Sequence, residues 1–341
     1  MDMSLKPSSR GRKYQSRKKR NFAKLLLPVC FIALIILGVC GIIKAIPGKS
    51  LVKNYETKNY TSALYGADIF SDDLCVVTEN VAYNEFQSED EFYATSLMNL
   101  STNETLLAEN VHEKVYPAST TKLMTFYLAV KYGNLEDIVT ISKSATILPS
   151  GSSRAWLKEG DQMSLKDLLY SMMLASGNDS AIAISEYISG SEEDFAKLMT
   201  EEAKMLGATN TNFVNSHGYH DDNHYTTAYD LYLIMNACLK YDSFVELIST
   251  STYRTAITES NGYPRKVEWT QTNFFLNGLY EVPKGVTVVG GKTGTTDEAK
   301  NCLMLYCLDK ENNPYLAIIM GAETKGKLYT NMSSLISTLA N

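Results

Sequence analysis

Cysteine and histidine are scarce in this sequence, and the cysteines are not spaced to hold zinc. The 341 residues include six cysteines and four histidines. The cysteines match none of the paired spacings of zinc sites, so the sequence predicts no site of that kind. Those beyond residue 60 are Cys75, Cys238, Cys302 and Cys307. Buried thiols are favoured for them, with a disulfide as the alternative in an oxidising compartment.

Basic residues are scarce outside the first 24 positions. Residues 1–24 hold nine of the 32 Lys and Arg and one of the 38 Asp and Glu. The rest of the chain therefore has 23 basic and 37 acidic residues, a formal net charge of −14. An acidic domain repels the phosphate backbone, so we expect no nucleic-acid partner.

A stretch without charge follows the basic tail, and no small-x-small cleavage site comes after it. Residues 25–43 form this stretch, and as a helix nineteen residues would span roughly 28 Å, the thickness of a bilayer core. Positive residues stay on the cytoplasmic side. We predict a cytoplasmic tail at 1–24 and a single-pass signal-anchor in the cell membrane at 25–46, with a cleaved signal peptide as the alternative. A linker at 47–60 would lead to an extracytoplasmic domain at 61–341.

Hydrophobic periodicity predicts strands at both ends of this domain and helices between them. Strands are expected at 73–78, 91–100, 104–110, 251–258, 265–270, 285–294, 301–308 and 315–323. Helices are expected at 119–133, 164–175, 191–207, 226–241 and 328–340. This order indicates an α/β (α+β) fold, with one sheet built from both chain ends and a helical lobe inserted in the middle. Cys302 and Cys307 are an odd number of positions apart, so on one strand they would face opposite sides.

The first candidate site motif is Ser119-x-x-Lys122, at the start of a predicted helix. Residues at i and i+3 share a helix face, so the two side chains can meet. Unpaired N–H groups at a helix start favour negative charge on the serine oxygen. A desolvated lysine near another cation can be neutral and accept the serine proton. Alone the motif is weak, since a surface helix with a solvated lysine shows the same spacing.

Two further motifs have a polar and a cationic character. Ser176-Gly177-Asn178 offers a hydroxyl that can relay a proton and an amide that can hold a carbonyl, although a plain helix–helix turn looks the same. Lys292-Thr293-Gly294 ends a predicted strand, where the ammonium would attract a carboxylate. A phosphate-binding loop needs glycine six positions before its lysine, and Val286 stands there instead.

In this order the three motifs are those of β-lactamases and penicillin-binding proteins. Over residues 111–322 the chain resembles the low-molecular-mass penicillin-binding proteins, the serine D-alanyl-D-alanine carboxypeptidases of peptidase family S11. The resemblance implies the penicillin-recognising fold, with an antiparallel sheet flanked by helices and a helical lobe. It also implies an enzyme without metal or organic cofactor. That enzyme would remove the terminal D-Ala from peptidoglycan stem peptides and be acylated by β-lactams.

The resemblance also assigns roles to residues. Ser119 would be the nucleophile, Lys122 its general base, and Ser176 a second catalytic hydroxyl. The substrate-binding residues would be Asn178, Lys292, Thr293, Gly294 and Thr295, with the backbone N–H groups of Ser119 and Thr295 as oxyanion donors. Two positions depart from the family pattern: Gly290 stands where Asp is frequent, and Lys300 where a glycine is usual. These departures concern substrate preference, not the catalytic atoms.

Three alternatives stay open. A class A β-lactamase would need Glu-x-x-x-Asn after the second motif, but Thr211 stands four positions before Asn215, so fast deacylation is not expected. A non-catalytic cell-wall scaffold on the same fold would not need the motif residues. His217, His220 and His224 lie close together beside two aspartates, but their spacing fits no zinc motif.

Overall fold

The computed structural model describes residues 73–88 and 90–340. The predicted tail, membrane span and linker lie outside this part. Within it, no helix combines the length and the apolarity needed to cross a bilayer.

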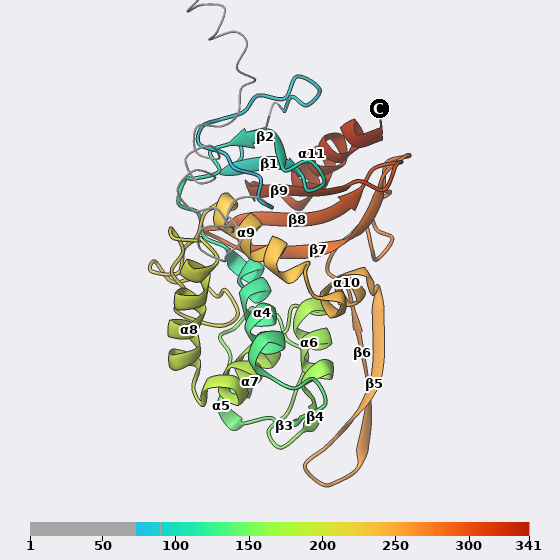
Figure 1. The fold of residues 1–341 in the computed structure, drawn as a ribbon. Helices are drawn as coiled ribbons and strands as arrows, with labels where there is room; N and C mark the ends of the chain where they lie inside the picture. Colours follow the sequence, from blue (N-terminus) through green and yellow to red (C-terminus); the bar gives the residue numbers. More distant parts are fainter. Residues whose placement is uncertain (1–72, 89, 341) are drawn as a thin grey trace, which may run out of the picture. The chain divides into compact units, whose positions relative to one another are not determined.

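A five-stranded antiparallel sheet joins the two ends of the described chain, as predicted (Figure 1). Its strand order is β2-β1-β9-β8-β7, which leaves β7 at an edge. The strands are β1 (Ala94–Asn99), β2 (Glu104–Glu109), β7 (Thr287–Thr296), β8 (Lys300–Leu308) and β9 (Pro314–Ala322). The expected strand at 73–78 is wrong. Cys75 is buried there, but its N–H donates to the Tyr232 hydroxyl at 2.8 Å and not to a neighbouring strand.

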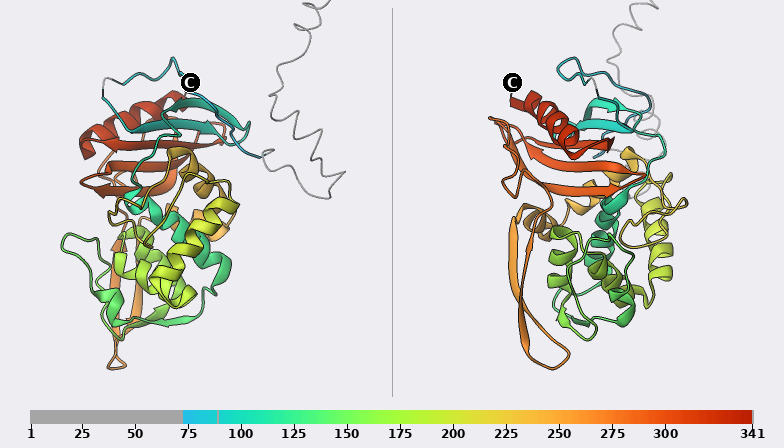
Figure 2. Two further views of the ribbon diagram at one scale, coloured as in Figure 1. Left: turned by 90° about the vertical axis from the view of Figure 1, so that its left-hand side faces the viewer. Right: turned by 180° about the vertical axis from the view of Figure 1, so that it is seen from behind.

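Each face of this sheet carries its own core. Helix α11 (Lys325–Ser337) covers the outer face, and the helical lobe lies on the other side (Figure 2). Cys302 belongs to the lobe-side core and Cys307 to the α11-side core, which confirms that they point to opposite faces. Both are buried free thiols, as are Cys75 and Cys238.

Helices fill the lobe, and side-chain caps start several of them. They are the 3₁₀ turn η1 (Ala118–Thr121), α4 (Lys122–Tyr132), α5 (Lys143–Thr146), α6 (Leu165–Leu174), α7 (Asn178–Ser189), α8 (Glu192–Met205), α9 (Ala228–Cys238) and α10 (Asp242–Ser249). The Ser164 hydroxyl accepts the backbone N–H of Asp167, and the Ser191 hydroxyl accepts that of Asp194, the third residue of each helix. Helix α7 was not predicted, because it begins after Gly177 without a side-chain cap and its first eight residues are all buried.

A second, four-stranded sheet flanks the lobe and corrects the single-sheet prediction. It consists of β3 (Ile138–Thr140), β4 (Gln162–Ser164), β5 (Thr252–Thr258) and β6 (Pro264–Thr270), in that order. The β5–β6 hairpin forms around Asn261-Gly262 as expected, with Gly262 at φ +83°. It joins this sheet where Thr258 of β5 pairs with Gln162 of β4, and Tyr253 of β5 stacks on Tyr170 of α6, with ring centroids 3.9 Å apart. Strands of three residues are too short to show alternation.

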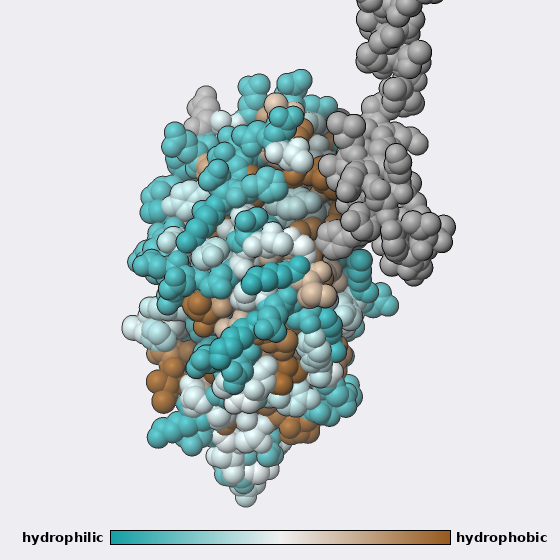
Figure 3. Space-filling model, turned by 60° about the vertical axis from the view of Figure 1, so that its left-hand side comes forward, coloured by the Kyte–Doolittle hydropathy of each residue, from teal (hydrophilic) through white to brown (hydrophobic). Residues whose placement is uncertain are grey.

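One face of the molecule is mainly hydrophilic, with hydrophobic residues in separate small groups (Figure 3). Isolated exposed apolar side chains are normal on a protein surface. The described residues visible on this face therefore form no broad apolar patch.

Candidate functional site

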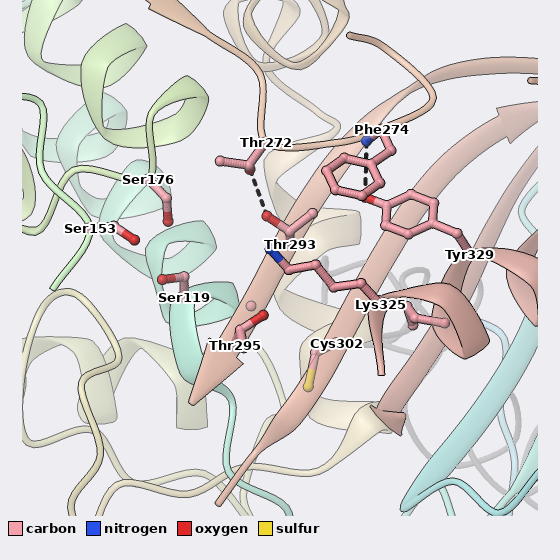
Figure 4. A pocket seen from close by; sticks show the side chains of 12 residues that line it. Ser119, Ser153, Ser176, Thr272, Phe274, Thr293, Thr295, Cys302, Lys325 and Tyr329 are labelled. Carbon is pink, nitrogen blue, oxygen red and sulfur yellow. Dashed lines mark hydrogen bonds between the residues drawn. The ribbon is translucent and has the colours of Figure 1, made fainter. Parts of the chain in front are cut away.

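Three chain segments that are far apart in sequence meet between the lobe and the edge of the large sheet. Ser119 comes from η1, Ser176 from the α6–α7 connection, and Thr293 and Thr295 from β7. They line one cavity of about 130 Å³ (Figure 4). The structure therefore brings the three predicted motifs together.

Lys122 is fully buried, and its amine has three oxygen partners. The Nζ atom lies 3.0 Å from Ser119 Oγ, 2.8 Å from Asn178 Oδ1 and 2.7 Å from the His217 carbonyl oxygen. The amide and carbonyl oxygens can only accept. A neutral amine has two hydrogens, and these two oxygens take both. Its lone pair then faces Ser119, and the hydroxyl can donate to it.

Burial favours this neutral form of Lys122. It lowers the pKa of Lys122 well below the usual value, and the charge of Lys292 lowers it further. The carboxylates of Asp179 and Glu192 act in the opposite direction on that pKa. Desolvation and a nearby cation are the two effects that activate a lysine as a base.

Lys292 faces the second motif and not open solvent. Its side chain is 1% exposed, and Nζ donates to Ser176 Oγ and to the Thr293 carbonyl, both at 3.0 Å. Burial lowers its pKa to about 7. The exposed cation in the cavity lining is Lys325, at the start of α11. Figure 4 shows its side chain extending along the pocket toward Thr293.

Two non-glycine residues of the site have left-handed backbone. Ala118, directly before Ser119, has φ +47°, and Ser176 has φ +56°. Such conformations cost about 1 kcal/mol or more each and persist where the surrounding structure fixes them. Strain of this kind gathers at functional sites.

The segment at Ser216 and His217 holds Lys122 in place. The resemblance implied that this loop supports the site, but sequence reasoning did not identify the backbone carbonyl that contacts the lysine. The Thr125 hydroxyl donates to the Ser216 carbonyl at 2.6 Å, one turn along α4 from Lys122. Glu192 accepts from the Ser216 N–H at 3.0 Å and from its hydroxyl at 2.7 Å. A backbone carbonyl that holds a catalytic amine leaves no signal in side-chain identity.

Two of the three histidines considered as metal ligands, His217 and His224, have structural roles. His224 Nδ1 accepts from the Val214 N–H at 3.1 Å, so Nε2–H donates to the Thr121 hydroxyl at 2.8 Å. His217 Nδ1 accepts from the Tyr219 N–H at 3.0 Å. Burial lowers the pKa of both His217 and His224 to about 3. Within the described chain no three His, Cys, Asp or Glu residues are grouped to hold a metal.

Asp179, next to the second motif, was also missed. Its carboxylate is buried and accepts N–H groups of Ala155 at 2.9 Å, Leu157 at 3.1 Å and Ser180 at 3.0 Å. Burial raises the pKa of Asp179, while these hydrogen bonds lower it. The carboxylate thereby fixes the loop that brings Ser153 into the cleft. The available signal in the sequence was the position of Asp179, directly after Asn178 of the second motif.

The two departures from the family pattern have local physical causes. A Cβ added to Gly290 would lie 2.2 Å from the Ile248 carbonyl oxygen, at the end of α10. An aspartate therefore has no room at this position. Lys300 has φ +57° at the start of β8, directly after the β7–β8 turn, a conformation that glycine adopts without strain.

This turn gives a test of stability. We expect Lys300→Gly to be about 1 kcal/mol more stable than Lys300→Ala, because only glycine relieves the left-handed backbone. The ion pair with Glu323 is 3.7 Å long and is lost in both variants. Urea unfolding of the two variants measures the difference. An alanine variant as stable as the glycine variant would contradict the explanation.

Known proteins resemble this chain in sequence and in fold. A family model described as D-alanyl-D-alanine carboxypeptidase matches residues 84–324. The D-alanyl-D-alanine carboxypeptidase DacF of Bacillus subtilis is 36% identical over 234 residues, 67% of this chain and 57% of that protein. DacC of Escherichia coli, also a D-alanyl-D-alanine carboxypeptidase, is 33% identical over 251 residues, which are 71% of this chain and 59% of that protein. The chain thus spans less than two thirds of either relative. The crystal structure of the Streptomyces K15 DD-transpeptidase aligns with a TM-score of 0.67 and 25% identity, covering 77% of this chain and 99% of that one.

Proposed function

The chain belongs to the D-alanyl-D-alanine carboxypeptidase family, peptidase family S11, and we propose that it is itself a serine D-Ala-D-Ala carboxypeptidase. The observation that carries this proposal is the contact of the buried Lys122 amine with Ser119 Oγ at 3.0 Å. The substrate would be a peptidoglycan stem peptide ending in D-Ala-D-Ala, and β-lactams would acylate the same serine.

Acylation would begin with attack of Ser119 Oγ on the carbonyl carbon of the penultimate D-Ala, while its proton passes to Lys122 Nζ. The N–H groups of Ser119 and Thr295 would hold the oxyanion. The bond to the terminal D-Ala nitrogen then breaks. Ser176 would give its hydroxyl proton to that nitrogen and take back the proton that Lys122 accepted, while Lys292 Nζ, 3.0 Å from Ser176 Oγ, holds the hydroxyl in place. Water next attacks the ester and releases the shortened peptide and free Ser119.

The carboxylate of the departing D-Ala would lie in the cavity of about 130 Å³, at the end where the lysines are. Thr293 and Lys325 line this end, and Lys292 is buried behind it. The Thr293 hydroxyl lies 2.6 Å from the Thr272 hydroxyl, which fixes its direction. Hydrogen bonds from Thr293 and Lys325 to a substrate carboxylate would be charge-assisted, and such bonds are stronger than neutral ones.

Such an enzyme would work outside the cytoplasm. We propose the signal-anchor at 25–46 as the membrane attachment, with domain boundaries as given from the sequence. The basic residues of 1–24 and the uncharged stretch at 25–43 support this proposal.

The proposed activity is tested with a synthetic stem pentapeptide. Full-length protein should release one D-Ala for each tetrapeptide formed, as measured by mass spectrometry. Ser119→Ala, with an unchanged circular dichroism spectrum, should release none. Release by the folded Ser119→Ala variant would refute the assignment of the nucleophile. Absence of release by the wild-type protein would favour a non-catalytic scaffold.

A β-lactamase would need a base to activate water against the penicilloyl ester. Thr211, at the position where such a glutamate would stand, is 3% exposed and donates to Asp230 at 2.7 Å. It lines neither the cavity of about 130 Å³ nor a second cavity, of about 420 Å³, whose lining also includes Ser119. We therefore expect a stable penicilloyl adduct, and hydrolysis of penicillin at many turnovers per second would contradict this.

The pH dependence of acylation should reflect the coupling of the two lysines. Acylation needs neutral Lys122, so its rate should fall as Lys122 is protonated at low pH. The Lys292 charge lowers the pKa of Lys122. Lys292→Gln removes that charge, raises the pKa of Lys122 and should move the acid limb to higher pH. Second-order acylation rates with a β-lactam between about pH 4 and pH 9 test this. An acid limb that stays in place or moves to lower pH would be inconsistent with it.

A further inference from the structure

Glu192, the first residue of α8, holds the segment that contacts Lys122. Its Oε1 atom accepts hydrogen bonds from the Ser216 N–H at 3.0 Å and from the Ser216 hydroxyl at 2.7 Å. His217 Nε2 lies 3.4 Å from the same oxygen. One carboxylate oxygen therefore contacts three polar groups of residues 216–217. Glu192 lines neither of the two cavities that include Ser119.

The imidazole beside this carboxylate is neutral. His217 Nδ1 accepts from the Tyr219 N–H at 3.0 Å, so Nε2 carries the proton on the side of Glu192. Burial lowers the pKa of His217 to about 3, so the ring has no charge near pH 7. The negative charge of Glu192 is therefore not neutralised by His217.

The segment that Glu192 holds contacts both reacting groups. The His217 carbonyl accepts from Lys122 Nζ at 2.7 Å. At the next residue, a Cβ added to Gly218 would lie 1.8 Å from the carbonyl oxygen of Ala118, directly before the nucleophile. A displacement of this segment would therefore move the amine and the serine relative to each other.

Two helices fix the backbone of Ser216 from outside the segment. Thr125 of α4 donates to the Ser216 carbonyl at 2.6 Å, and Glu192 of α8 accepts from the N–H of the same residue. Ser216 is fully buried and lies outside any helix or strand of the described chain. Its two backbone polar groups are thus satisfied by side chains, and the position of the segment depends on these side chains.

Charged groups from three elements act on the base. Burial has the largest effect on the pKa of Lys122 and lowers it, and the charge of Lys292 on β7 lowers it further. The carboxylates of Asp179 on α7 and Glu192 on α8 raise the same pKa. His224 is also buried near this amine, but its ring is neutral near pH 7 because burial lowers its pKa to about 3. Glu192 and Lys292 therefore act on the base in opposite directions.

We propose that Glu192 is a positioning residue for the acylation of Ser119. Its carboxylate fixes the backbone at 216–217, and a carbonyl of this backbone keeps the Lys122 amine against the nucleophile. Its charge also opposes that of Lys292 at the amine. Glu192 forms no hydrogen bond with either reacting group in the described chain, so it acts through the backbone that it holds and through its charge. The inference rests on the proposed carboxypeptidase function, because it concerns the acylation step of that reaction.

Two substitutions separate these effects. Glu192→Gln keeps an oxygen acceptor for Ser216, so the acylation rate on its pH plateau should stay within about threefold of the wild type. Its acid limb should move to lower pH, because loss of the negative charge lowers the pKa of Lys122. This shift is opposite in sign to that expected for Lys292→Gln. Glu192→Ala loses the acceptor as well, and its plateau rate should fall about tenfold or more, because small misplacements of reacting groups are costly.

The measurement is the rate of labelling of full-length protein by excess fluorescent penicillin between about pH 4 and pH 9. With excess reagent the rate describes each active molecule, so it does not depend on how much of a variant is folded. Glu193→Gln is the matched control, because it removes a carboxylate from the next residue, whose side chain is 83% exposed and pairs with Lys197. Its plateau and acid limb should equal those of the wild type.

Two results would overturn the proposal. One is a Glu192→Ala plateau rate within about threefold of the wild type, which is also what a role in stability alone would give, since only the labelled fraction would then fall. The other is an acid limb of Glu192→Gln that stays in place or moves to higher pH. In both cases labelling of the wild type would leave the proposed function standing. A folded wild-type protein that is never labelled would refute that function instead.

Discussion

Lys122→Met is expected to slow acylation of Ser119 about a thousandfold, within the range for loss of a general base. The amine is fully buried, and two of its oxygen partners can only accept hydrogen bonds. Methionine fills a similar volume but has no lone pair able to take the serine proton. Lys122→Arg should be as slow, because a guanidinium stays protonated. The measurement is the second-order rate constant with a fluorescent penicillin.

Lys131→Met is the matched control for this variant. Lys131 lies on the same helix, α4, and pairs with Glu202 at 2.6 Å away from both cavities. Its acylation rate should stay within about threefold of the wild type, as for a change outside the site. A Lys122→Met protein that acylates nearly as fast as Lys131→Met would show that another group is the base.

Gly218→Ala should have the largest structural effect. Gly218 has φ +85°, and an added Cβ would lie 1.8 Å from the Ala118 carbonyl oxygen. Ala118 itself is left-handed and precedes the nucleophile, so any relief of the clash displaces Ser119. We expect a loss of about 3 kcal/mol or more in the free energy of unfolding. Acylation should fall at least about a hundredfold, because small misplacements of reacting groups are costly.

Substitution of a second glycine distinguishes the effect of the steric clash from the effect of backbone strain. Gly262, in the β5–β6 turn, has φ +83° but an added Cβ meets nothing within 4 Å. Gly262→Ala should cost only about 1 kcal/mol in the free energy of unfolding and leave acylation unchanged. Urea unfolding and penicillin labelling of both variants provide the comparison. Equal effects of the two substitutions would contradict the role given to Gly218.

The parts of the fold and of the candidate site that depend on the identity and order of side chains could be predicted from the sequence. Ser119, Ser176 and Lys292 were identified from short motifs, and the large sheet from strands at both chain ends. Capping serines located α6 and α8 for the same reason, since a cap needs a particular side chain at a particular place.

Other parts depend on backbone placement, which sequence patterns do not record. The His217 carbonyl that holds Lys122 could be any residue's carbonyl. The burial of Lys292 behind Thr293 follows from packing of β7 against the lobe. Helix α7 and the short strands β3 and β4 lack the caps, periodicity or length that sequence reasoning needs.

The central claim is that Ser119 is acylated with the aid of Lys122. The most direct measurement is peptide mapping by mass spectrometry after treatment of the full-length protein with a β-lactam. We predict one added β-lactam mass per chain, located on Ser119, and no added mass in Ser119→Ala. An adduct on any other residue, or an unmodified wild-type chain that is folded, would contradict the claim.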